Sequence, residues 1–138
     1  MQRLIALTVG GVLLSVVLFS SSTQMTAADK DVPNIEDIMK IVNKPKGLHK
    51  TVGKALEEAT VNWDDVTKMT KQYSELADAL PKNKCPKGDA KSWDKLCKSY
   101  ADDAKALNAA AGKKDKEAAK VAFGKLNKSC QGCHDEHR

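Results

Sequence analysis

Apolar side chains recur three and four residues apart through residues 29–138, and hardly any stretch alternates with a period of two. This spacing lines apolar residues along one face of an α-helix, whereas a half-buried strand needs strict alternation. We therefore expect an all-α fold. Because the connections between the periodic stretches are short, we predict an antiparallel, up-down-up-down four-helix bundle.

Breakers and capping residues divide this region into four helices. Pro45-Lys46-Gly47 interrupts the first apolar stripe, Pro81 ends the second and Gly112 ends the third. The fourth helix is expected to run to the end of the chain. Each predicted helix follows a side chain that favours a helix N-terminus. These capping residues are Asn34, Asn62, Asp89 and Asp115.

Residues 1–28 have the pattern of a secretory signal peptide. Arg3 supplies the positive start, residues 4–19 the apolar core, and residues 20–28 a small polar exit. An uncleaved membrane anchor is the alternative, although the apolar run is short and diluted for a membrane span. We predict an exported, periplasmic-type protein with no stable membrane insertion after cleavage. Residues 29–138 have the length of one domain.

The charge is modestly basic and dispersed. The chain has 23 lysines and arginines, 18 aspartates and glutamates, and a formal net charge of +5. Lysines are spread along every segment and aromatic residues are few, which argues against a nucleic-acid-binding surface. A weakly basic face could still steer an acidic protein partner. No acid, base or nucleophile constellation indicates catalysis, so we do not expect an enzyme.

The strongest chemical signal is Cys130-Gln131-Gly132-Cys133-His134, close to the end of the chain. Two cysteines at this spacing, followed at once by histidine, are the pattern of covalent haem attachment. Cys130 and Cys133 would add to the two haem vinyl groups, and His134 would be an axial iron ligand. A redox dithiol and half of a zinc site are the alternatives. The first normally opens a helix beside a βαβ pattern, and the second needs another closely spaced pair. We predict one covalently bound haem c.

Cys130 and Cys133 continue the apolar stripe of the fourth helix, which contains Ala119, Ala122 and Leu126. The haem is therefore expected inside the bundle, near one end. There it would complete a core that is rich in alanine and poor in aromatic residues.

A helical bundle with this motif at the end of its last helix resembles the class II c-type cytochromes, which comprise cytochrome c′ and its low-spin relatives of the cytochrome c556 type. The resemblance covers essentially residues 29–138. It implies that Arg138 pairs with a haem propionate. His137 stands where these proteins commonly have an aromatic residue, and we interpret it as a surface residue. Relatives often dimerise through their first two helices, so a homodimer is possible.

The resemblance also implies that a residue of the first helix approaches the far side of the iron. A methionine there gives a low-spin electron carrier, and a non-coordinating residue gives an iron that binds small gases such as NO or CO. In an up-and-down bundle Met39 lies at the haem end of the first helix. Met69 lies roughly 16 Å from the haem end of the second helix, measured along the helix axis. We predict Met39 as the distal ligand. His49 is the alternative if the break at 45–47 folds the chain back.

The same bundle geometry places four residues around the haem as packing. The indole N–H of one of them, Trp93, has a propionate as a possible partner. The four are Leu76, Leu80, Trp93 and Leu96.

The two remaining cysteines, Cys85 and Cys97, form an even pair in a chain predicted to be exported, which favours a disulfide. Two free thiols are the alternative. Taken together, the sequence predicts an exported monohaem one-electron carrier that exchanges electrons with redox partner proteins. A gas-binding protein with an open iron is the second interpretation, and a helical module without haem is the third.

Overall fold

Side-chain caps begin four of the five α-helices in the computed structural model, which describes residues 32–138. In each case an asparagine or aspartate oxygen accepts a hydrogen bond from the backbone N–H three residues on. The predicted signal segment lies outside the described residues. The four capped helices are α1 (Ile35–Asn43) after Asn34, α3 (Trp63–Ala79) after Asn62, α4 (Ala90–Gly112) after Asp89 and α5 (Lys116–His137) after Asp115.

The predicted first helix is two helices, α1 and α2 (Leu48–Glu57), joined by a tight turn. The N–H of Gly47 donates to the Lys44 carbonyl at 2.7 Å. A Cβ on Gly47 would lie only 2.5 Å from the Val42 carbonyl oxygen. Glycine is therefore the residue that lets the turn close against the end of α1. The chain of α3 ends in a short 3₁₀ turn, Leu80–Lys82, which contains Pro81.

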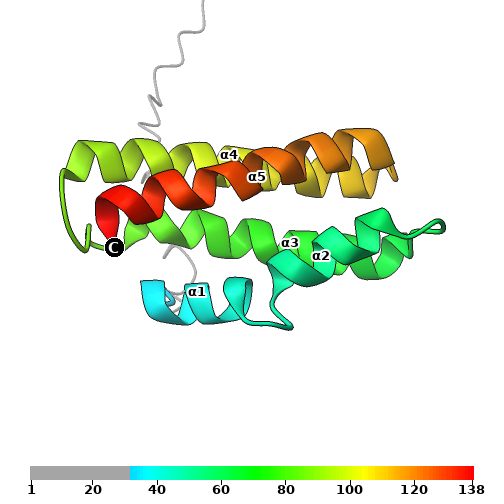
Figure 1. The fold of residues 1–138 in the computed structure, drawn as a ribbon, viewed down its shortest axis with the longest axis horizontal. Helices are drawn as coiled ribbons and strands as arrows, with labels where there is room; N and C mark the ends of the chain where they lie inside the picture. Colours follow the sequence, from blue (N-terminus) through cyan, green and yellow to red (C-terminus); the bar gives the residue numbers. More distant parts are fainter. Residues whose placement is uncertain (1–31) are drawn as a thin grey trace, which may run out of the picture.

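The three long helices α3, α4 and α5 form the body of the bundle, with α2 against α3 and α5 (Figure 1). The Tyr100 hydroxyl donates to Tyr73, and Thr67 donates to the Ala111 carbonyl. Residue numbers thus rise along α3 while those of their α4 partners fall, so these two helices run in opposite directions. At the other side of α4, Ser92 near its start bonds Glu136 near the end of α5.

The core consists of aliphatic side chains and many alanines, as the sequence indicates. Ile38 and Val42 anchor α1, and Val52 and Leu56 anchor α2, all at 1% exposure or less. The prediction of an all-α helical bundle is confirmed. Within residues 32–138, no helix has the length and apolar character needed to cross a membrane.

Candidate haem site

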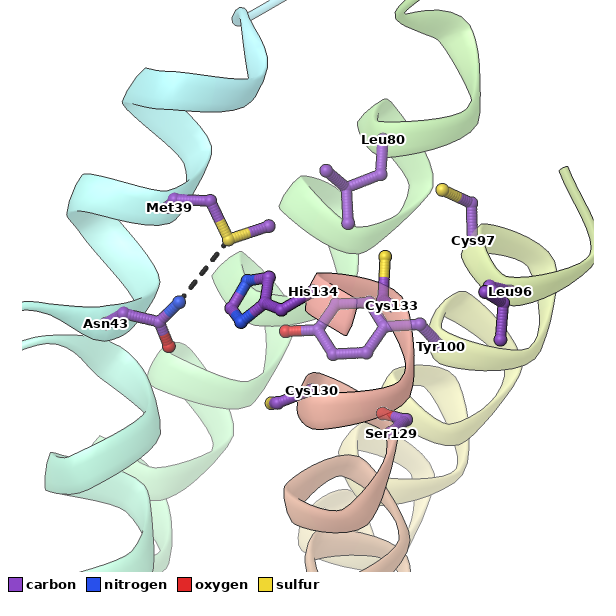
Figure 2. A pocket seen from close by; sticks show the side chains of 10 residues that line it. All are labelled: Met39, Asn43, Leu80, Leu96, Cys97, Tyr100, Ser129, Cys130, Cys133 and His134. Atoms are coloured by element: carbon purple, nitrogen blue, oxygen red, sulfur yellow. Dashed lines mark hydrogen bonds between the residues drawn. The ribbon is translucent and has the colours of Figure 1, made fainter. Parts of the chain in front are cut away.

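The residues of the predicted haem motif lie in the last two turns of α5. Cys130, Cys133 and His134 are all half-buried. They line one narrow pocket together with Met39, which comes from α1 (Figure 2). The tertiary structure thus brings a thioether from one helix to the same pocket as the two thiols and the imidazole of another.

A wider cavity of about 740 Å³ adjoins the narrow pocket and shares Met39, Asn43, Cys133 and His134 with it. Its lining includes two cationic side chains, Lys87 and Arg138. The other residues that line it are Ile35, Pro86, Trp93 and His137.

One face of α1 borders this cavity. Ile35, Met39 and Asn43 are four residues apart, so they lie on the same side of the helix. Ile38 and Val42 hold α1 to the core with another side. The helix is therefore anchored without using the face that carries Met39.

These residues fit a haem. The pocket offers two thiols for thioether bonds, an imidazole and a thioether as iron ligands, and Leu80 and Leu96 as apolar walls. The wide cavity is lined in part by Lys87 and Arg138, whose positive charges suit ionised propionates.

Burial raises the pKa of both Cys130 and Cys133 above the ordinary value of a thiol. Redox-active dithiols need a lowered pKa, which a helix N-terminus or a nearby positive charge supplies. This pair has neither the lowered pKa nor the helix start, because it lies at the C-terminal end of α5. The dithiol alternative is therefore disfavoured.

Leu80 and Leu96 line the narrow pocket, and Trp93 is buried at the wall of the wide cavity. The Trp93 indole N–H donates to the Asn83 carbonyl at 3.3 Å, so it already has a partner other than a propionate.

Leu76, predicted as a haem-packing residue, does not line either pocket that contains His134. It lies one turn before Leu80, is buried in the core, and lines a different groove beside Pro33 and Lys82.

His49 does not reach the pocket that contains His134, which contradicts the alternative ligand assignment. The chain continues past the turn as α2, which places His49 against α3 and α5. Its ring stacks on Phe123 with centroids 4.6 Å apart, and its Nε2 donates to Asn127 Oδ1 at 3.3 Å. Its Nδ1 is then the acceptor for the Tyr73 hydroxyl, 3.0 Å away.

Cys85 and Cys97 are free thiols, in contrast to the predicted disulfide. The helix α4 turns Cys97 into the narrow pocket, where it is 1% exposed. The Cys85 thiol donates to the Lys87 carbonyl at 3.0 Å. Burial raises the pKa of Cys97 to about 12, so it stays protonated.

His137 is buried, in contrast to the surface position expected from the sequence. Its Nδ1 donates to the Lys87 carbonyl at 2.7 Å, and its ring packs edge-on against Trp93. It thereby ties the end of α5 to the loop before α4. The helical spacing of Leu126, Cys130, Cys133 and His137 was the available signal, because all four continue one stripe.

The sequence did not indicate a series of side-chain hydrogen bonds that runs through the core. The Tyr100 hydroxyl borders the narrow pocket and donates at 2.8 Å to Tyr73, which is fully buried. Tyr73 in turn donates to His49. Burial raises the pKa of both tyrosines, so both hydroxyls remain protonated donors.

Replacement of Tyr73 by phenylalanine is expected to destabilise the holoprotein by about 1–3 kcal/mol, since it removes the partner of two buried polar groups without making a large cavity. Urea unfolding measures this change. Tyr100→Phe is the matched control. It should cost less, because Tyr73 then keeps its bond to His49. A larger loss for Tyr100→Phe would contradict this order.

The comparisons with known proteins agree with the site. Searches of curated proteins and of solved structures gave no match. A family model described as Cytochrome C′ matches residues 33–138, which is most of the chain and includes every residue of the site. The chain therefore belongs to the cytochrome c′ family, the class II c-type cytochromes, whose cofactor is a covalently bound haem c with iron.

Proposed function

We propose that this chain is an exported monohaem cytochrome that carries one electron. Cys130 and Cys133 hold the haem covalently, His134 is the proximal ligand and Met39 is the distal ligand. The haem lies near one end of an antiparallel, up-down-up-down bundle. The observation that carries the proposal is that Met39 of α1 and His134 of α5 line the same narrow pocket as the two thiols.

The bound iron would supply the redox chemistry by alternating between its ferric and ferrous states. The protein side chains set how readily it does so. A methionine and histidine ligand pair raises the reduction potential of haem iron. Leu80, Leu96 and the ring of Tyr100 exclude water from the pocket, which favours the less charged ferrous state. Lys87 and Arg138, which line the wide cavity, would neutralise the propionates.

This arrangement suits electron transfer better than substrate chemistry. Two axial ligands from the protein leave no iron position for a substrate. The cysteine thiols, with raised pKa values, would be consumed in thioether bonds. We therefore propose a carrier and not an enzyme.

The second candidate is a gas-binding protein with a five-coordinate iron, which the match to the cytochrome c′ family favours. In that case Met39 is a packing residue at the pocket wall. The two candidates differ in whether a small ligand must displace a protein side chain.

Optical spectra of the exported holoprotein distinguish them. Oxidised, reduced and CO-treated reduced samples are compared. The carrier should be low-spin in both oxidation states and change little under CO. A high-spin spectrum that shifts promptly with CO would replace the carrier by the gas-binding candidate. A colourless protein, made together with haem-maturation machinery, would reject both.

An acidic redox protein is the proposed partner. Lys82, Lys84 and Lys87 are exposed in the loop between α3 and α4, and Lys87 and Arg138 border the wide cavity. Charge steering of this kind is screened by salt, with a Debye length of about 10 Å at 0.1 M. The electron-transfer rate with an acidic acceptor protein should therefore fall steeply with ionic strength. A salt-independent rate would contradict the proposal.

A further inference from the structure

The Met39 sulfur accepts a hydrogen bond from a side chain one turn away on the same helix. Asn43 Nδ2 donates to Met39 Sδ at 3.3 Å, and both residues line the narrow pocket and the wide cavity (Figure 2). Among residues 32–138 there is one other methionine, Met69, and no hydrogen bond reaches its sulfur. Of these two methionines, the amide is thus directed at the one whose sulfur shares a pocket with His134.

The backbone fixes Asn43 in this position. It is the last residue of α1, and the turn that follows closes against the helix end through the bond from Gly47 to Lys44. The space at Gly47 is too small for a Cβ. The α1 helix also keeps Met39 and Asn43 four residues apart on one face, so the donor moves with the sulfur.

A thioether sulfur has two lone pairs and is a weak acceptor. A hydrogen bond to one lone pair restricts the rotation of the methionine tip and leaves the other lone pair for a metal. It also draws electron density from the sulfur, which then stabilises ferric iron less. Hydrogen bonds to a metal ligand from a residue that does not itself bind the metal orient that ligand and tune the reduction potential of the metal.

We propose that Asn43 is a positioning residue that holds Met39 as the sixth ligand and raises the reduction potential through the Met39 sulfur. The inference rests on the proposed function, because it requires that Met39 ligates the iron. It assigns to Asn43 a role that neither the sequence motif nor the family match assigns.

The test uses the holoprotein with Asn43→Leu, which is close in size and cannot donate. The variant should have a lower reduction potential than the wild type. If Asn43→Leu acted only by making the pocket more apolar, it would favour the ferrous state and raise the reduction potential. A lower reduction potential therefore identifies the lost hydrogen bond to Met39 as the cause. Displacement of Met39 by CO in the reduced protein should become about tenfold faster, the lower end of outer-shell effects on metal affinity. Asn43→Gln, which retains the amide, should fall between the wild type and Asn43→Leu.

A double-mutant cycle shows whether the effect passes through the sulfur. In the Met39→Leu background, Asn43→Leu should leave the CO reaction unchanged. Equal potentials and equal CO rates for Asn43→Leu and the wild type would overturn the role of Asn43 while the wild type remains low-spin. A high-spin wild type that binds CO at once would instead overturn the proposed function. Because Asn43 is exposed, loss of folding is not expected, and the helical circular dichroism verifies this.

Discussion

Replacing both Cys130 and Cys133 by alanine will leave the exported protein without covalently bound haem. The two thiols line the same pocket as His134, and no other pair of cysteines has the spacing of the two vinyl groups. The expected loss is essentially complete, because the thioether bonds are the covalent attachment. It is measured by staining for haem after denaturing electrophoresis, which removes haem that is held only by ligation.

The chain provides a matched control for this experiment. Cys85→Ala with Cys97→Ala removes the same number of thiols, both of them free in the structure. This variant should retain its covalent haem. It should lose some stability, since Cys97 is buried against the narrow pocket. Covalent haem in the Cys130→Ala, Cys133→Ala protein, or its absence from the control, would show that the attachment site is assigned incorrectly.

The substitution Met39→Ala will convert the low-spin holoprotein into a high-spin one that binds CO. Removal of the thioether opens the sixth position, and CO binding to the reduced protein should rise from negligible to near-complete at saturating CO. The reduction potential should fall, because methionine ligation raises it. Spectra with and without CO, together with a redox titration, measure both changes.

Met69→Ala is the corresponding control. Met69 is half-buried on α3, packs against the core and lines neither the narrow pocket nor the wide cavity. Its removal should cost up to about 2 kcal/mol in the free energy of unfolding and leave the spectrum unchanged. A low-spin spectrum that survives Met39→Ala would reject Met39 as the ligand, whatever the effect of Met69→Ala.

Local signals in the sequence were sufficient for the helix boundaries. Asn34, Asn62, Asp89 and Asp115 each accept the backbone hydrogen bond expected of a helix cap, because that interaction involves residues only three apart. The break at 45–47 was also predicted, and it separates α1 from α2. The haem motif was recognisable for the same reason, since its chemistry depends on spacing within five consecutive residues.

Predictions about which face a side chain presents were less successful. His137 was interpreted as a surface residue from its place after the haem motif, although it continues the stripe of Cys130 and Cys133, and the structure buries it. Leu76 was placed beside the haem from the expected bundle geometry, and it lines a groove separate from both pockets of the site. Helical spacing gives the angle between residues of one helix. It does not give the rotation of that helix against its neighbours, which depends on how all the side chains pack.

The sequence by itself determined the helices, their caps and the chemical identity of the site, because each of these depends on residues close together in the chain. Only the tertiary structure decided which distant residues meet. It brought Met39 to the pocket of His134, directed Asn43 at the Met39 sulfur, engaged His49 with Tyr73 and turned the Cys85 and Cys97 thiols to different surroundings. These outcomes depend on the packing of α1 to α5 as a whole. Because the interior is close-packed, the position of each side chain is set by neighbours from several helices and not by its local sequence.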